Sequence, residues 1–128
     1  MDATICRITL EVGGGASSFY GTVFGEEGRS VGGGRVYFDC GPVVLALLEK
    51  HDPSPLPEHV YFAVNDLDVV YARAKTLGAL SKEVVHGSSA AEIVKRPWGE
   101  RSFYVEDPWK NKLCFVDERT LFTGRELR

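Results

Sequence analysis

Side chains that can recognise a small organic molecule are concentrated in residues 96–117 of this 128-residue chain. The segment RPWGERSFYVEDPWKNKLCFVD contains both tryptophans, two arginines and a cysteine. Aromatic rings stack on flat organic molecules, and a guanidinium group can lie over such rings. Trp98, Arg101 and Phe103, together with Tyr61, are therefore predicted to form an aromatic and cationic wall of a binding site. The alternatives are core packing for Phe103 and a solvent-facing position for Arg101.

Three other side chains carry groups that can contact a ligand. Arg7 can clamp a carboxylate or a phosphate-like anion, and pairing with Glu11 is an equal alternative. His59 opens the apolar run HVYFAV, either as a hydrogen-bonding group of the site or as an ordinary residue at a strand start. Cys114 alternates with apolar neighbours and can face a cleft, but no adjacent His or Asp would activate its thiol as a nucleophile. Glu100 is expected on the polar surface.

The segment that carries most of these residues predicts a β-hairpin. Its arms, residues 101–106 and 112–117, are rich in aromatic and apolar residues, and DPWKN lies between them. The proline fixes φ in a tight turn, and the side chain of Asp107 can accept hydrogen bonds from the turn backbone. Asn111 tolerates a left-handed conformation.

The same order of elements is predicted twice along the chain. In the first half the pattern indicates a strand, a helix ended by Gly25, a loop or weak edge strand, and two strands, over residues 4–12, 16–24, 26–34, 35–40 and 43–49. In the second half it indicates a strand, a helix capped by Asn65 and Asp66 and ended by Gly78, a short strand and the hairpin. These elements cover residues 59–64, 67–77, 83–86 and 101–117.

This order, together with HVYFAVNDLDVVYARAKTLGA and RSFYVEDPWKNKLCFVD, resembles the vicinal-oxygen-chelate superfamily, which includes glyoxalase I, bleomycin-resistance proteins and extradiol dioxygenases. The resemblance implies a single α+β domain in which two βαβββ modules form a curved, cleft-enclosing mixed sheet with helices outside. The modules are residues 4–49 and 58–117, and a proline-rich linker, residues 50–57, joins them. One departure is Lys110, where the family usually has Gly, and Asn111 is expected to adopt the unusual backbone conformation instead.

The resemblance also identifies four positions that hold the metal ion in the family's enzymes. They lie on the first and last strand of each module and correspond here to Arg7, Ala46, His59 and Cys114. Only His59 matches a ligand. A divalent metal needs about three imidazole or carboxylate donors, and Arg7 is a fixed cation. We therefore expect no catalytic metal and no cofactor.

The leading hypothesis is metal-free binding of a small organic molecule in the cleft of a homodimer, as in bleomycin-resistance proteins. The alternative is a metal-dependent glyoxalase-like lyase, an isomerase or a ring-cleaving dioxygenase. Its ligands would include Glu11, Glu49 or Asp117, because a register shift of one residue exchanges the two faces of a strand. A third hypothesis is an interaction module that binds no small ligand.

Composition narrows the partners and the compartment. The net charge of −3 offers no basic footprint for nucleic acid, and no apolar run approaches the length of a membrane span. The N-terminus has no signal-peptide pattern. The three cysteines, Cys6, Cys40 and Cys114, include no CxxC pair and lie in apolar runs, so each is predicted to be a buried free thiol in a cytoplasmic protein.

Overall fold

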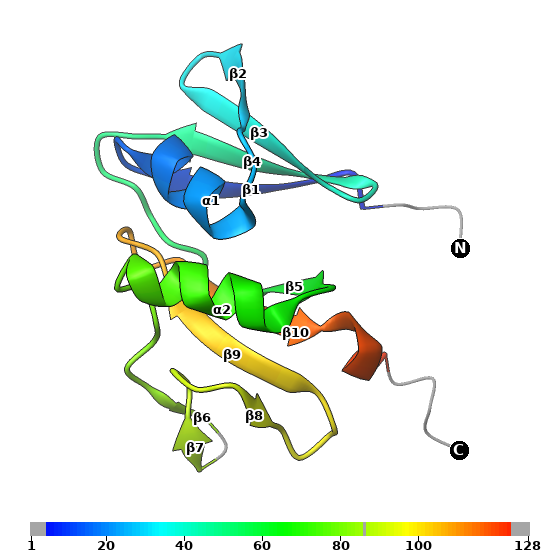
Figure 1. Ribbon diagram of the computed structural model, residues 1–128. Coiled ribbons are helices and arrows are strands. Elements are labelled where there is room, and N and C mark those ends of the chain that lie inside the picture. Colours follow the sequence, from blue (N-terminus) through cyan, green and yellow to red (C-terminus); the bar gives the residue numbers. More distant parts are fainter. Residues whose placement is uncertain (1–4, 86, 124–128) are drawn as a thin grey trace. The chain divides into compact units, whose positions relative to one another are not determined.

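The computed structural model describes residues 5–85 and 87–123 (Figure 1). Contacts divide the chain into two compact units, Met1–Pro57 and Glu58–Arg128. Each unit contains one α-helix and one open, mixed sheet of four strands. The expected α+β class is therefore confirmed.

The first unit has the order strand, helix and three strands. Its elements are β1 (Arg7–Val12), α1 (Ala16–Phe24), β2 (Arg29–Gly32), β3 (Arg35–Cys40) and β4 (Val43–Glu49). The strand order is β1-β4-β3-β2, with β1 parallel to β4 and the other neighbours antiparallel. The bounds of α1, β3 and β4 are those predicted, and the weak edge strand is β2.

The core of the first unit lies between its sheet and α1. Apolar side chains of β1 and β4 are at most 2% exposed there: Leu10, Val12, Leu45 and Leu47. Phe38 of β3 packs edge-to-face on Phe24 of α1, with ring centroids 5.3 Å apart. Gly25 ends the helix in the left-handed region, with φ of 69°, as expected for a glycine C-cap.

The second unit repeats this order and adds short strands. Its elements are β5 (Val60–Val64), α2 (Leu67–Thr76), β6 (Val84–Val85), β7 (Ser88–Ser89), β8 (Val94–Lys95), β9 (Arg101–Glu106), β10 (Lys112–Asp117) and a 3₁₀ turn, Glu118–Thr120. The main sheet has the order β5-β10-β9-β8, with β5 parallel to β10, while β6 and β7 pair separately. The predicted strand 83–86 corresponds to β6, and residue 86 lies outside the described residues.

Helix α2 covers one face of the main sheet in the second unit (Figure 1). The side chain of Asp66 caps the helix by accepting a hydrogen bond from Val69 N at 3.2 Å, as predicted. Tyr71 packs edge-to-face on Phe103 at 5.2 Å, and Phe103 stacks on Phe115 at 5.6 Å. These rings form the centre of the helix-side core. In the described part of the chain, neither α-helix is long and apolar enough to cross a membrane.

The hairpin turn differs from the prediction at one residue. Asp107 Oδ1 accepts hydrogen bonds from Trp109 N at 2.9 Å and from Asn111 N at 2.7 Å, and Asn111 Nδ2 donates to Asp107 Oδ2 at 2.9 Å. However, Lys110 adopts the left-handed conformation, with φ of 70°, so the expectation for Asn111 is wrong. The backbone and side chain of Asn111 are both bound to Asp107, and the chain therefore reverses one residue earlier.

The cysteines are less uniform than predicted. Cys114 is buried, Cys40 is half-buried and Cys6 is exposed. Cys6 precedes β1, and the buried side chains of that strand begin only at Leu10. The prediction of a buried thiol is therefore wrong for Cys6.

Candidate functional site

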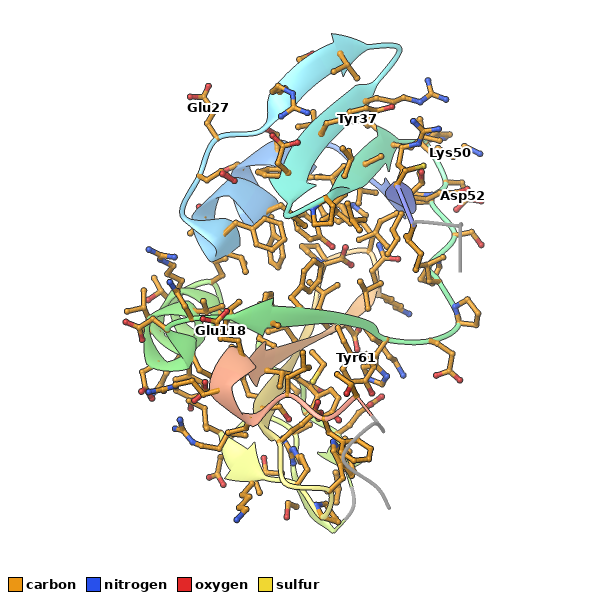
Figure 2. The ribbon with its side chains drawn as sticks, turned by 90° about the vertical axis from the view of Figure 1, so that its right-hand side faces the viewer. Glu27, Tyr37, Lys50, Asp52, Tyr61 and Glu118 are labelled. Atoms are coloured by element: carbon orange, nitrogen blue, oxygen red, sulfur yellow. The ribbon has the colours of Figure 1, made fainter. Side chains whose placement is uncertain are left out.

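A cavity of about 450 Å³ lies within the second unit. Its lining comes from β5 and β10, from the loop that precedes β9, and from the segment that follows β10: Tyr61, Phe62, Ala63, Val116, Trp98, Glu100, Leu121 and Phe122. Tyr61 extends from β5 and is 56% exposed (Figure 2). The cavity brings together two of the residues predicted for a binding site, Tyr61 and Trp98.

The pairing of β5 with β10 determines which side chains face the cavity. Tyr61 lies opposite Cys114, and Ala63 lies opposite Val116. Successive side chains of a strand point to opposite faces of a sheet. These four residues therefore share the face opposite α2, while alternate residues such as Phe115 point toward the helix.

Glu100 holds two walls of the cavity in place. It is only 6% exposed, and its Oε1 accepts a hydrogen bond from Trp98 Nε1 at 2.7 Å. Its Oε2 accepts from Phe122 N at 2.9 Å. The expectation of a surface position for Glu100 is therefore wrong, because the loop and the C-terminal segment cover its side chain.

Arg96 is a second buried charge on this face. It lies directly opposite Glu100, since Arg96 N donates to Glu100 O at 2.7 Å, and it is 2% exposed. Its Nε and Nη2 donate to Oγ and O of Ser102, both at 3.0 Å, and Nη2 lies 3.5 Å from Glu92 O. The guanidinium lies 5.0 Å from the ring centroid of Tyr104. Its Nη1 has no hydrogen-bond partner among residues 5–85 and 87–123.

His59 belongs to an aromatic cluster beside the cavity. Its ring centroid lies 5.0 Å from that of Tyr104 and 6.1 Å from that of Tyr61. The Tyr104 hydroxyl interacts with Tyr61 and Cys114, and burial raises the pKa of Tyr104. Burial also raises the pKa of the Cys114 thiol to about 11. Cys114 is therefore protonated at neutral pH, which makes it a poor nucleophile.

Arg101 and Phe103 lie on the opposite face of the sheet from Tyr61. Arg101 Nη1 is 3.2 Å from Asp117 Oδ2, and its Nη2 is 3.9 Å from Asp68 Oδ1 of α2. Phe103 is fully buried in the helix-side core. The four residues predicted as one wall are thus divided between two faces, because Arg101 and Phe103 are two residues apart on one strand.

The residues at the four metal positions of the resembled family do not fit a divalent cation. Arg7 and Ala46 lie on the face of the first sheet opposite α1, and they offer a fixed cation and a methyl group. In the second unit, His59 offers an imidazole and Cys114 a buried, protonated thiol. Within the described residues, no three His, Cys, Asp or Glu side chains gather as a metal site would require.

The three carboxylates that a shifted register would recruit as metal ligands either bind other protein groups or lie on the helix side of their sheet. Arg119 donates from Nη2 to Asp117 Oδ2 at 2.9 Å, and this pairing, with help from Arg101, lowers the pKa of Asp117 to about 2. Asp117 also faces α2. Glu49 shares the helix-side face of β4, and Glu11 accepts a hydrogen bond from Ser54 N at 2.9 Å. The observed register of the first sheet therefore places Glu11 and Glu49 on opposite faces.

Comparisons with known protein families and solved structures agree with the fold described above. The family model of the Glyoxalase/Bleomycin resistance protein/Dioxygenase superfamily matches residues 15–115. Among solved structures, the oxidase ChaP-H2 has a TM-score of 0.72 at 22% identity, over 91% of this chain and 94% of that chain. A glyoxalase/bleomycin resistance protein from Catenulispora acidiphila DSM 44928 has a TM-score of 0.67 at 19% identity, over 90% and 98%.

A lactoylglutathione lyase from Agrobacterium tumefaciens has a TM-score of 0.61 at 24% identity, over 90% of this chain and 93% of that chain. The comparison with curated proteins gave no match. At these identities the structural likeness shows the fold, which hosts several activities.

Proposed function

Because the chain belongs to the Glyoxalase/Bleomycin resistance protein/Dioxygenase superfamily, we propose that it binds a small organic molecule in the cavity of its second unit, without a metal ion. The observation that carries this proposal is the cavity, whose volume of about 450 Å³ suits a small ligand. The rings of Tyr61, Trp98 and Phe122 contribute to its lining. Such rings favour a ligand with a flat, apolar body.

Binding, rather than lyase or dioxygenase chemistry, is the function that the side chains support. Metal-assisted proton abstraction of the glyoxalase type needs a carboxylate base at the ion. Ala46 stands at one family position for a carboxylate, and Cys114 stands at the other with a raised pKa. We therefore propose that the protein sequesters its ligand unchanged.

A metal-depleted sample tests this function. The protein is treated with a chelator and screened with flat aromatic compounds by thermal shift, because a ligand of the native state raises the melting temperature. We expect some of these compounds to raise the melting temperature of the metal-depleted protein. The Trp98→Leu variant should bind the same compounds roughly tenfold or more weakly. Trp109→Leu is the matched control, since Trp109 lies in the hairpin turn outside the cavity lining.

Two outcomes would overturn the proposal. Binding that requires stoichiometric zinc, nickel or iron would favour the metal-dependent enzyme. The absence of stabilisation across the whole panel would favour the interaction module.

We further propose that the protein acts as a cytoplasmic homodimer. The resembled family often completes its clefts with a second subunit, and twofold pairing is the commonest form of oligomer. Light scattering coupled to size-exclusion chromatography measures the mass directly, and a mass of 14.1 kDa would contradict this proposal.

A further inference from the structure

Among the described residues that line the cavity, the carboxylate of Glu100 is the single charged side chain. Its residue is 94% shielded from solvent, and buried charges are normally paired with an opposite charge. The two hydrogen-bond donors of Glu100, Trp98 Nε1 and Phe122 N, are both neutral. Among the described residues, no Lys, Arg or His nitrogen lies within 4.0 Å of this carboxylate. Within residues 5–85 and 87–123, the Glu100 carboxylate is therefore a buried acceptor without a cationic partner.

The neighbouring cation that could pair with Glu100, Arg96, binds other groups instead. Arg96 faces it across the strand pair, and directly opposed residues have Cβ atoms about 5 Å apart. The guanidinium instead binds Ser102 and lies over the ring of Tyr104. Among the described residues, each carboxylate oxygen of Glu100 accepts one N–H, which leaves a further lone pair on each oxygen. The carboxylate can therefore accept a hydrogen bond or an ion pair from a molecule in the cavity.

The aromatic lining favours the same kind of ligand. Tyr61, Trp98 and Phe122 line the cavity together with Glu100. The face of an aromatic ring attracts a cation, and desolvation strengthens this attraction. A carboxylate among three aromatic residues thus recognises an ammonium group and repels an anion.

We infer that the cavity selects organic cations, which carry a protonated amine or a quaternary ammonium group on an apolar or aromatic body, with the charged nitrogen against Glu100. This inference rests on the proposed function, since it assigns a class of ligand to the same cavity. Arg96 is 2% exposed and is not among the described residues that line the cavity.

Three probes of similar size test the selectivity on the intact protein: benzyltrimethylammonium, benzyl alcohol and benzoate. The quaternary ammonium stays charged at every pH, so its protonation cannot change on binding. Titrations are followed by tryptophan fluorescence and by calorimetry. We expect benzyltrimethylammonium to bind roughly tenfold or more tightly than benzyl alcohol, and benzoate to bind most weakly.

A pair of variants assigns the preference to Glu100. Glu100→Gln keeps the size and one acceptor oxygen but removes the charge. We expect it to reduce the ratio of the affinity for benzyltrimethylammonium to the affinity for benzyl alcohol, both measured on the same variant, roughly tenfold. Glu92→Gln changes the net charge equally at an exposed side chain and should retain the preference. If Glu100→Gln does not fold, the ranking of the three probes on the natural protein decides.

The outcomes separate the two proposals. Equal or weaker binding of the cation relative to benzyl alcohol would overturn the inference and leave small-molecule binding intact. Loss of the preference in both variants would also overturn it, because the attraction would then come from the overall charge. If none of the probes binds and the aromatic screen is also negative, the proposed function itself fails.

Discussion

Replacing Lys110 by glycine should stabilise the protein. Lys110 has φ of 70°, a conformation that costs an L-residue about 1–2 kcal/mol. Glycine removes this penalty but loses about 0.5–1 kcal/mol through the greater freedom of the unfolded chain. The side chain of Lys110 is exposed, so its removal adds no cavity. We therefore expect Lys110→Gly to raise the free energy of unfolding by about 0.5–1 kcal/mol.

The expected change is large enough to measure. For a chain of 128 residues it corresponds to an increase in the melting temperature of about 2–4 °C. Thermal melts followed by circular dichroism, and denaturant titrations followed by tryptophan fluorescence, report it independently. The slope of the denaturant titration should stay the same, because the surface exposed on unfolding does not change.

Asn111→Gly is the matched control in the same turn. Asn111 is 1% exposed and its Nδ2 donates to Asp107 Oδ2 at 2.9 Å, so this substitution should lower the free energy of unfolding by about 1–3 kcal/mol. Stabilisation by Asn111→Gly together with no gain from Lys110→Gly would refute the reasoning. The left-handed residue would then be Asn111, as the sequence suggests.

Three further outcomes follow from the second unit. Arg119 and Arg101 hold the pKa of Asp117 at about 2, below its value of about 3.9 in unfolded chains, so its stabilisation is complete above about pH 4 and is lost toward pH 2. Denaturant midpoints across this range should therefore fall more steeply for the natural protein than for Asp117→Asn. A thiol reagent at pH 8 should label Cys6 immediately and Cys114 only after unfolding, because Cys114 is buried and its pKa is about 11. Labelling is followed by mass spectrometry, and rapid labelling of Cys114 in the native protein would contradict this expectation. Phe103→Leu should lower the free energy of unfolding by about 1–2 kcal/mol without weakening ligand binding, since Phe103 packs under α2, and a selective loss of affinity would show a direct role in the site.

The elements that the sequence predicts well are those fixed by neighbouring residues. The side chain of Asp66 caps α2 by accepting a hydrogen bond from the backbone N–H of Val69, three residues later. Gly25 directly follows the last residue of α1 and ends that helix. Asp107 organises the hairpin by hydrogen bonds that reach at most four residues along the chain. Spacing along the sequence reveals such interactions directly.

The candidate site is less predictable because distant segments build it. Glu100 is buried partly because Phe122, 22 residues later, donates its backbone N–H to the carboxylate. No periodicity in the sequence links these two positions. By contrast, the placement of Arg101 and Phe103 on the helix side of the sheet could be predicted from the sequence. A strand that points Phe103 into the core must point Arg101 to the same face, because the two residues are two positions apart.

The separation of Arg96 from Glu100 is best understood beside another ion pair of the same protein. On the exposed strands β2 and β3, Arg29 closes on both oxygens of Asp39, at 2.7 and 3.1 Å. Burial strengthens the attraction between opposite charges, so on this ground alone the buried Arg96 and Glu100 should pair more readily than the exposed Arg29 and Asp39. Arg96 and Glu100 instead bind neutral groups, and the desolvation penalty of a buried ion pair can exceed the free energy gained from its Coulomb attraction. Among the described residues the two buried charges thus stay apart, and the Glu100 carboxylate remains the acceptor on which the proposed recognition of an organic cation depends.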